Sequence, residues 1–285
     1  MNNHANLDKR KLIEFIRNGI SEDVGDGDHT SLACIDVDQR DNARLLVKDN
    51  GVIAGIAVAK EIFHFLDPSA SFEAILNDGD EVKYGDIAFK INCQTRALLI
   101  GERLALNTMQ RLSGIATLSR QFAKEVTDKK TTILDTRKTT PLLRFLEKWA
   151  VQIGGCTNYR DGLYDRIMIK DNHIAAAGSL SKAMLKVEEY LAGLNKSLEI
   201  TLEVRTFEEI SEALQLTTKP RLMLDNFSIE ELDRAVKMIK GRFETEASGG
   251  IRLNDVRKIA STGVDFISVG ALTHSAQCLD LSLKI

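Results

Sequence analysis

The 285-residue sequence predicts an α/β protein with two domains, an α+β domain followed by repeated βα units. From about Thr131 onward, short apolar runs alternate six times with longer helical patterns, which is typical of a parallel sheet in a barrel or an open twisted sheet. The first hundred residues instead contain strand-like runs separated by glycines. At roughly 100–200 residues per domain, the length allows either one large domain or two small ones.

The first domain is expected to span residues 1–110, and the second residues 111–285, with the last residues free to return to the first. An amphipathic helix is predicted around residues 9–20. A long helix at 101–126 is expected to bridge the two domains. The strand-like runs of the first domain lie at 43–56 and 79–93.

Helix-start signals follow several of the strands predicted in the second domain. Thr206 with Glu209, and Ser228 with Glu231, have the spacing of a capping box. Pro141 fits the first turn of another helix, because N–H groups in that turn have no partner within the helix and proline, which lacks an N–H, loses no hydrogen bond there. The six predicted strands span residues 131–135, 166–170, 198–204, 221–225, 242–248 and 265–270.

Composition and charge exclude several function classes. The chain has 38 basic and 41 acidic residues, so no global positive field attracts nucleic acid, and no nucleic-acid partner is expected. The longest apolar run, 52–59, is far shorter than the roughly 20 residues of a membrane-spanning helix, so no membrane partner is expected. The polar amino terminus shows no secretory pattern, which favours a cytoplasmic location.

The four cysteines lie far apart, and none forms a C-x-x-C pair that would hold zinc or exchange disulfides. They are expected to be reduced thiols, mostly buried. They are Cys34, Cys93, Cys156 and Cys278.

Polar, charged or glycine residues follow the end of each predicted strand. In parallel α/β sheets these positions share one edge, where ligands bind. One such residue is more often a solvated loop residue or a helix cap, but six strand ends together favour a shared site. The positions are Asp135, Arg137, Lys138, Lys170, Asn172, His173, Glu203, Asp225, Asn226, Ser248, Gly249, Gly250, Gly270, Thr273, His274 and Ser275.

The chemistry of these positions predicts a substrate with several negative charges. Arginine forks bind planar carboxylates and phosphates, and basic side chains dominate the rim: Arg137, Lys138, Arg160 and Lys170, with Arg144 one helical turn further. The turn at 248–250, together with 269–271, resembles the phosphate site of βα barrels.

Two acidic residues, Glu203 and Asp225, are predicted at neighbouring strand ends. Their carboxylates could hold a hydrated Mg²⁺ ion or the hydroxyls of a ribose. The alternative is a salt bridge to Lys170 or Arg137.

The run at 133–174, ILDTRKTTPLLRFLEKWAVQIGGCTNYRDGLYDRIMIKDNHI, resembles the core signature of the quinolinate phosphoribosyltransferase family, also called nicotinate-nucleotide pyrophosphorylase (carboxylating). The resemblance covers nearly the whole chain in the expected order. Further matching segments lie at 22–31, 102–107, 112–117, 202–204, 223–227, 246–251 and 269–275.

The resemblance implies a fold in which an amino-terminal α+β open sandwich domain precedes an incomplete, six- to seven-stranded α/β barrel. It also implies transfer of phosphoribosyl from phosphoribosyl pyrophosphate to quinolinate, giving nicotinate mononucleotide, pyrophosphate and carbon dioxide in de novo NAD biosynthesis. Mg²⁺ is the implied cofactor, with no organic cofactor. Subunits would pair head to tail in a homodimer or hexamer, each completing its partner's site.

The resemblance also implies roles for individual residues. Quinolinate carboxylates would be held by Arg137, Arg160 and Lys170, with Arg103 reaching in from the second subunit. Lys138, Glu203 and Asp225 match residues around the ribose, Mg²⁺ and pyrophosphate, and with Lys170 they form the expected catalytic set. The 5′-phosphate site and its surroundings would comprise Ser248, Gly249, Gly250, Val269, Gly270, Ala271 and His274, and Thr136 is a further substrate-binding candidate.

The sequence departs from the family pattern at two positions. Tyr159, a further substrate-binding candidate near the quinolinate carboxylates, stands where the family usually has histidine, so a phenol that donates one hydrogen bond replaces a group that can carry charge. Arg205 stands where relatives often have an acid. These departures leave open a related enzyme acting on another anionic aromatic substrate. A barrel that binds a sugar phosphate without turnover is a further alternative.

Overall fold

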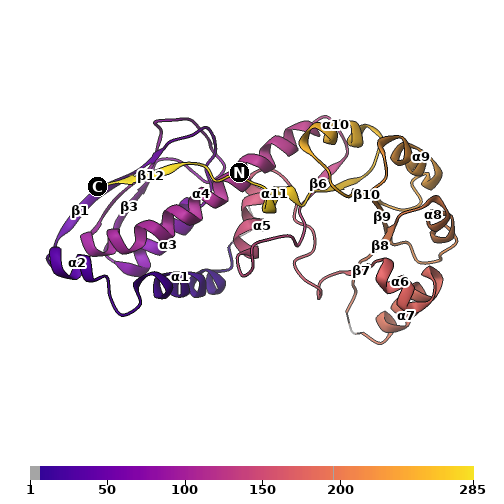
Figure 1. Ribbon diagram of the computed structural model, residues 1–285, viewed down its shortest axis with the longest axis horizontal. Helices are drawn as coiled ribbons and strands as arrows, with labels where there is room; N and C mark the ends of the chain where they lie inside the picture. Colours follow the sequence, from indigo (N-terminus) through magenta and orange to yellow (C-terminus); the bar gives the residue numbers. More distant parts are fainter. Residues whose placement is uncertain (1–6, 195) are drawn as a thin grey trace. The chain divides into compact units, whose positions relative to one another are not determined.

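The computed structural model describes residues 7–194 and 196–285, and the chain forms two compact units. The first comprises Met1–Arg120, Thr139–Gly155 and Ser275–Ile285. The second comprises Gln121–Lys138 and Cys156–His274. Figure 1 colours these parts along the chain.

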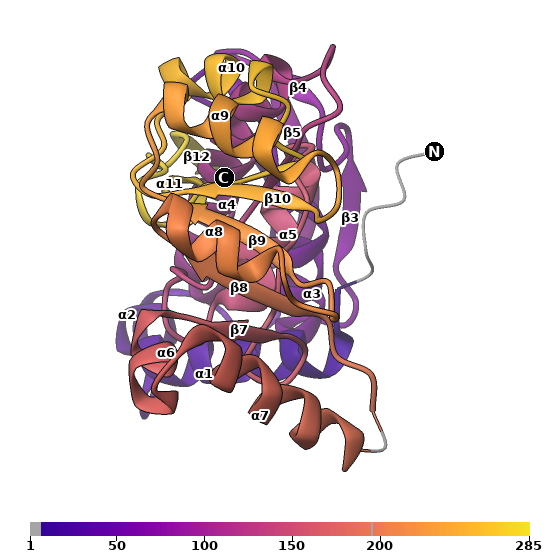
Figure 2. The same cartoon turned by 90° about the vertical axis from the view of Figure 1, so that its right-hand side faces the viewer.

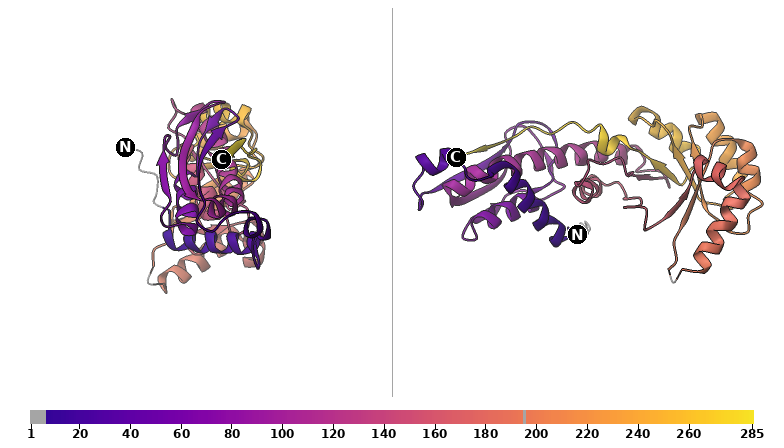
Figure 3. Two further views of the ribbon diagram at one scale, coloured as in Figure 1. Left: turned by 90° about the vertical axis from the view of Figure 1, so that its left-hand side faces the viewer. Right: turned by 60° about the horizontal axis from the view of Figure 1, so that its bottom comes forward.

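The first unit is built around a four-stranded antiparallel sheet with the order β12-β1-β5-β3, and β2 pairs separately with β4. The strands of the larger sheet lie side by side in the left view of Figure 3. The strands of the first unit are β1 (Arg40–Val47), β2 (Gly51–Val52), β3 (Ser71–Ala74), β4 (Glu81–Val82), β5 (Ile87–Gln94) and β12 (Leu281–Lys284). Its helices are α1 (Lys9–Val24), α2 (His29–Cys34), α3 (Ile56–Leu66), α4 (Thr95–Glu125), which ends beyond Arg120, and α5 (Arg144–Ile153).

One face of this sheet packs against helices because its strands alternate apolar and polar residues. In β1, Ala43, Leu45 and Val47 are buried. The ring of Phe89 on β5 packs edge-on against Phe63 of α3, with ring centroids 6.3 Å apart. A mixed sheet-and-helix core of this kind is what the glycine-punctuated first hundred residues predict.

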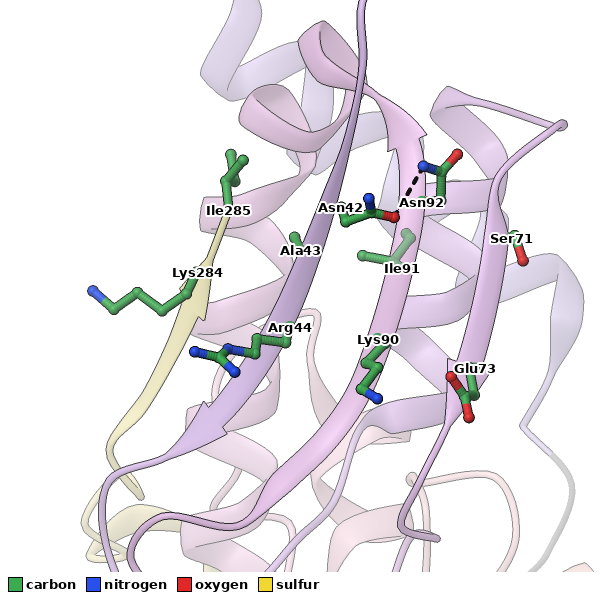
Figure 4. Close-up of a pocket in the computed structure, with 10 residues that line it drawn as sticks. All are labelled: Asn42, Ala43, Arg44, Ser71, Glu73, Lys90, Ile91, Asn92, Lys284 and Ile285. Carbon is green, nitrogen blue, oxygen red and sulfur yellow. Dashed lines mark hydrogen bonds between the residues drawn. The ribbon is translucent and has the colours of Figure 1, made fainter.

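The opposite face of the sheet is polar, and Figure 4 shows its side chains over a shallow hollow of about 520 Å³. The strand register places Arg44 opposite both Lys90 and Lys284. The Asn92 amide donates to the side-chain carbonyl of Asn42 over 3.1 Å. This face therefore carries mainly hydrogen-bonding and positively charged groups.

The second unit contains a six-stranded parallel sheet with the order β6-β11-β10-β9-β8-β7. Figure 2 shows β7 to β10 side by side with α8 and α9, and the right view of Figure 3 shows helices along one face of this sheet. The strands are β6 (Thr132–Leu134), β7 (Ile167–Ile169), β8 (Ile200–Val204), β9 (Arg221–Asp225), β10 (Thr245–Ser248) and β11 (Phe266–Ser268). The helices are α6 (Asp171–Ala177), α7 (Leu180–Ala192), α8 (Phe207–Ala213), α9 (Ile229–Ile239), α10 (Leu253–Ser261) and α11 (Ala271–His274).

The sheet stays open because its outer strands, β6 and β7, are not paired with each other in the part of the chain that the structure describes. Thr157 adds a single parallel bridge to Leu134 at the β6 edge. The expected incomplete barrel is therefore confirmed, with six strands. All five residues of β8 are buried, as in parallel strands covered on both faces.

Helix starts in this unit follow their local signals. Ser228 and Glu231 form the predicted capping box, and the Thr206 hydroxyl accepts a hydrogen bond from the Glu209 backbone N–H. Helix α9 then buries Leu232 and Ile239 on one face.

Three expectations need correction. The helix after Pro141 begins only at Arg144, because Leu142 adopts a left-handed conformation with φ of 66° that no helix continues through. Helix α1 runs four residues beyond its predicted end, through mainly polar residues, and α4 begins at Thr95 rather than at 101, because the buried Ala97 and Leu98 continue its apolar face. The cysteines are free as expected, but only Cys93 and Cys156 are buried.

Within the described residues, no helix combines the length and hydropathy needed to cross a membrane.

Candidate active site

The carboxyl ends of β7 and β8 bring together Lys170 and Glu203. Lys170 directly follows β7, and its Nζ lies 2.9 Å from Oε2 of Glu203. The Glu203 side chain is only 4% exposed, whereas that of Lys170 is 45% exposed. The salt bridge that the sequence allowed as an alternative for Glu203 is therefore present.

Asp225 ends β9, and its carboxylate is held by the neighbouring strand end. Its Oδ1 accepts a hydrogen bond from Oγ of Ser248 over 2.8 Å, and its Oδ2 accepts from Nδ2 of Asn226 over 2.8 Å. This contact follows from the parallel register, which pairs Ser248 with Asp225. Adjacent strand ends thus present an acid and a hydroxyl at one edge of the sheet.

Arg205 lies one residue beyond β8 and connects these strand ends. Its Nη2 lies 2.9 Å from Oε1 of Glu203, and its Nε lies 3.5 Å from Oδ2 of Asp225. Its Nη1 lies 2.6 Å from Oδ2 of Asp171, at the start of α6. One guanidinium therefore contacts a carboxylate from each of three consecutive strand ends.

The turn after β10 requires glycine. Gly249 has φ of +101°, and a Cβ atom there would lie 2.2 Å from Oδ1 of Asn226. The Asn226 N–H donates to the carbonyl of Ser248 over 2.9 Å, which fixes the two loops against each other. Gly250, with φ of +58°, has open space where its Cβ would lie. The backbone of this turn is thus accessible to a ligand.

The paired strands β6 and β11 lie at the opposite end of the strand order from β7, and the residues that follow them lie close together. A Cβ atom on Gly270 would lie 3.0 Å from both Nε2 of His274 and Cδ of Lys138. The buried Thr273 hydroxyl donates to the Lys138 carbonyl over 2.8 Å, and Oγ1 of Thr136 accepts from the Lys138 N–H. Val269 is buried at the end of β11, and Ala271 begins α11.

Arg137 and Arg160 concentrate positive charge near the end of β6. The Nε atom of Arg137 is buried and has no hydrogen-bond partner among the described residues. Burial and the nearby charge of Arg137 lower the pKa of Arg160 below its usual value. Nη2 of Arg160 lies 3.2 Å from Sδ of Met168, which is a weak acceptor. A buried guanidinium nitrogen without a partner beside a second guanidinium is the environment of an anion site.

Tyr159 is held from several directions. Its Oη lies 2.5 Å from Oγ1 of Thr201 on β8. The guanidinium carbons of Arg166 and Arg221 lie 5.0 and 5.6 Å from its ring centroid. Burial, and then the charge of Glu246, raise the pKa of Tyr159. The phenol therefore stays neutral near pH 7 and anchors the loop that carries Arg160.

Glu246 is a fully buried acid on β10. Ser268 of β11 donates a hydrogen bond to its Oε1, and Nη1 of Arg221 lies 3.4 Å from its Oε2. Burial raises the pKa of Glu246. This acid belongs to the interior polar groups that include Tyr159 rather than to the exposed strand ends.

Arg103 lies on α4 in the first unit, where it lines a cavity of about 330 Å³. Phe15, Asp23 and Asn107 also line this cavity. Its expected contribution to a partner's site stays a prediction.

The carboxylates at the sheet edge do not form a protein-only metal site. No cluster of three or more potential metal ligands occurs within residues 7–194 and 196–285. Glu203 and Asp225 instead contact Lys170 and Arg205. Carboxylate oxygens are ligands of Mg²⁺, which usually keeps several waters in its coordination shell, so a role for these two acids near Mg²⁺ stays a prediction.

Sequence reasoning missed several residues of this region. Asp171 follows a predicted strand directly, which was a usable signal. The pairing of Arg205 with three acids depends on strand neighbours that no local pattern reveals. Glu246 and Arg221 could have been suspected as charged residues inside apolar strands.

Two family descriptions match the chain. Residues 28–113 match the quinolinate phosphoribosyl transferase N-terminal domain, and residues 115–284 match the C-terminal domain. Together they cover most of both units.

Relatives are similar over nearly the full chain. The chain is 46% identical to quinolinate phosphoribosyltransferase [decarboxylating] 1b of Nicotiana tabacum, covering 99% of this chain and 83% of that protein. It is 41% identical to the probable nicotinate-nucleotide pyrophosphorylase [carboxylating] of a Synechocystis strain, covering 95% and 91%. The crystal structure of NadC from Streptococcus pyogenes superposes with a TM-score of 0.92 at 36% identity, covering 99% and 98%. This chain belongs to the quinolinate phosphoribosyltransferase family.

Proposed function

We propose that this chain transfers a phosphoribosyl group from phosphoribosyl pyrophosphate to quinolinate and releases one carboxylate as carbon dioxide. The products are nicotinate mononucleotide and pyrophosphate, and the enzyme class is a pentosyltransferase of NAD biosynthesis. The activities named for its relatives support this reaction. The single structural observation that carries it is the buried, unpartnered Nε of Arg137 beside Arg160.

Quinolinate carries two adjacent carboxylates, which need two cationic partners. Arg137 and Arg160 supply guanidinium groups whose geometry matches carboxylates. Lys170 is a third cation, and its half-exposed ammonium can contact substrate while it stays near Glu203. Nicotinate, with a single carboxylate, leaves part of this charge uncompensated. The acceptor site therefore selects a dianion.

Phosphoribosyl pyrophosphate is assigned to the remaining strand ends. Its 5′-phosphate is proposed to bind the turn at Ser248, Gly249 and Gly250, with the backbone at Val269, Gly270 and Ala271 and the side chain of His274 opposite. The exposed backbone of this turn, with open space where a Gly250 Cβ would lie, supports this placement. Lys138 and Thr136, on the loop beside Gly270, are proposed to bind the ribose and the pyrophosphate.

Glu203 and Asp225 are proposed to bind the ribose hydroxyls and, through water, the Mg²⁺ ion. Bound Mg²⁺ would neutralise the charge that develops on pyrophosphate as it leaves. The protein contributes the carboxylates that orient the sugar and the cations Lys138 and Lys170 that stabilise the departing group. No organic cofactor is part of the proposal.

The reaction itself needs little covalent chemistry from the protein. The quinolinate nitrogen attacks C1 of the ribose, and the bond from C1 to the pyrophosphate oxygen breaks. The alkylated ring nitrogen is then cationic, so the ring accepts the electron pair left when the adjacent carboxylate departs as carbon dioxide. A proton replaces that carboxylate, and Lys138 or Lys170 is the candidate donor. Preorganised charge supplies most of the catalysis.

A complete site is proposed to require a second subunit, either in a homodimer or in a hexamer. Arg103, which lines a cavity of the first unit, would contact quinolinate in the partner's site. Equal mixing of Arg103→Ala and Arg137→Ala subunits tests this directly. Shared sites predict recovery of about a quarter of wild-type activity after subunit exchange, whereas independent sites predict none.

The cytoplasm is the proposed location. The names of some relatives place those proteins in mitochondria or chloroplasts, as for the Nicotiana tabacum 2b and Arabidopsis thaliana proteins. Immunodetection in fractionated cells tests the proposal for this chain.

A product assay tests the function. Purified protein is mixed with Mg²⁺, phosphoribosyl pyrophosphate and either quinolinate or nicotinate, and nicotinate mononucleotide is measured by chromatography. The proposal predicts product from quinolinate and little from nicotinate. Product from nicotinate alone, or from neither acid with a folded oligomer, would overturn it.

A further inference from the structure

The guanidinium of Arg205 occupies the space between three carboxylates of the candidate active site. Asp171, Glu203 and Asp225 come from three consecutive strand ends and lie 2.6, 2.9 and 3.5 Å from its nitrogens. These acids would otherwise form a concentrated negative site. Arg205 is therefore a cation that the chain itself supplies at this place.

Every oxygen of the two strand-end carboxylates, Glu203 and Asp225, has at least one partner. One oxygen of Glu203 contacts Lys170 and the other contacts Arg205. One oxygen of Asp225 accepts from Ser248, and the other faces Asn226 and Arg205. A divalent cation could reach either acid directly only after a resident cation withdraws, because like charges exclude each other at this range.

The backbone of Arg205 is fixed, but its side chain is not enclosed. Its N–H donates to Oε2 of Glu209 over 2.6 Å, and the next residue, Thr206, caps helix α8. The side chain itself is 45% exposed. The guanidinium can therefore leave the carboxylates without any change in the strands or in α8.

We propose that Arg205 is a positioning residue that fills the acidic site of the substrate-free chain and prevents Glu203 and Asp225 from capturing a free divalent cation. The ion then enters together with the diphosphate substrate, whose own charge draws the guanidinium away. The identity of that substrate rests on the proposed function. That Arg205 prevents Glu203 and Asp225 from binding a free divalent cation does not depend on the identity of the substrate.

Metal binding without any substrate tests the block. Mn²⁺, a spectroscopic substitute for Mg²⁺, is titrated into the wild-type protein and into Arg205→Ala, and free Mn²⁺ is followed by electron paramagnetic resonance. Removing the resident cation is expected to tighten Mn²⁺ binding by about tenfold or more. Arg205→Lys, which retains the charge, should restore the weak binding of the wild type.

Two further variants locate the effect. Arg257→Ala removes another half-exposed arginine that pairs with a carboxylate, Asp128, in the same unit, and should leave Mn²⁺ affinity unchanged. Adding Glu203→Gln to Arg205→Ala should abolish the gained affinity. Equal affinities in the wild type and Arg205→Ala would overturn the proposal, as would a gain that persists in the double variant.

A kinetic readout separates this role from direct substrate binding. The concentration of free Mg²⁺ that gives half-maximal rate should fall in Arg205→Ala. An Arg205→Ala protein with unchanged metal affinity and a raised KM for phosphoribosyl pyrophosphate would instead make Arg205 a phosphate ligand and contradict the proposal. Absence of quinolinate turnover would refute the proposed function but leave the Mn²⁺ result intact.

Discussion

Glu147 in the first unit and Glu203 in the second are both buried glutamates, yet they are held in different ways. Oε1 of Glu147 accepts from Nε and Nη2 of Arg111, at 3.0 and 2.9 Å, and from the hydroxyl of Thr140. Its Oε2 accepts from the Thr140 backbone N–H over 3.0 Å. The side chain is completely buried.

Glu203 relies on two flexible side chains instead. Within the described residues, its carboxylate forms ion pairs with Lys170 and Arg205, whose side chains are each 45% exposed. The side chains of Lys170 and Arg205 are half exposed, so they can leave Glu203 and contact a substrate anion instead. Arg111 is held by two hydrogen bonds to a completely buried carboxylate. The same kind of ion pair is therefore enclosed at Glu147 and open to solvent at Glu203, where we propose that it gives way to substrate.

Arg111→Ala and Arg205→Ala should separate these roles most strongly. Arg111→Ala leaves a buried carboxylate without its cation and is expected to lower the free energy of unfolding by about 3–5 kcal/mol. Arg205→Ala should lower it much less, because ion pairs made by a solvent-exposed side chain contribute little. Urea denaturation measures both values, and similar losses in the two variants would refute the distinction.

Arg137→Ala tests whether an unpartnered cation at the sheet edge binds substrate. Loss of a desolvated carboxylate clamp is expected to reduce kcat/KM for quinolinate by at least about a hundredfold. Steady-state kinetics with quinolinate varied measures the change. A decrease smaller than about threefold would show that Arg137 does not hold a carboxylate. Arg257→Ala is the control, with kinetics like those of the wild type.

Gly249→Ala tests the proposed phosphate turn. A Cβ there clashes with Asn226 in a conformation with positive φ, so the turn must move. The KM for phosphoribosyl pyrophosphate should rise about tenfold or more. Gly241→Ala is a matched control, because Gly241 has φ of +68° with open space around it. That control should lose about 1 kcal/mol of stability without a change in KM.

The interior acid gives the smallest predicted effect, a change in pH dependence. Burial raises the folded-state pKa of Glu246 above 4.5, so its contribution to stability is complete below about pH 4.5 and falls as pH rises toward the folded-state pKa. The wild type should therefore lose stability relative to Glu246→Gln over this range, by at most about 1.4 kcal/mol per pH unit. Urea denaturation at several pH values measures the difference. A wild-type advantage that grows with pH would mean that Arg221 keeps Glu246 ionised.

The strands and most helix starts could be predicted because their signals are local. The runs at 131–135 and 221–225 contain β6 and β9, and the capping pairs at Thr206 and Ser228 begin α8 and α9. The start of α5 could not be predicted, because the left-handed turn at Leu142 has no sequence signal. Burial of the cysteines depended on tertiary packing, and two of them proved exposed.

The position of candidate residues at strand ends could also be predicted from the sequence, since parallel strands share one edge. Their partners could not. The contact of Ser248 with Asp225 requires β10 to lie beside β9, and the three contacts of Arg205 require the order β7, β8, β9. Strand order arises from the packing of the whole sheet, so a single sequence does not reveal which charges are paired and which are available. The roles of these residues stay predictions.

The most direct test of the account is a crystal structure of the protein with quinolinate bound. The account predicts a carboxylate oxygen of quinolinate about 2.7–3.2 Å from Nε of Arg137, with the second carboxylate facing Arg160 or Lys170. Quinolinate bound away from these residues, with Nε of Arg137 still lacking a partner, would contradict the assignment of the sheet edge as the acceptor site.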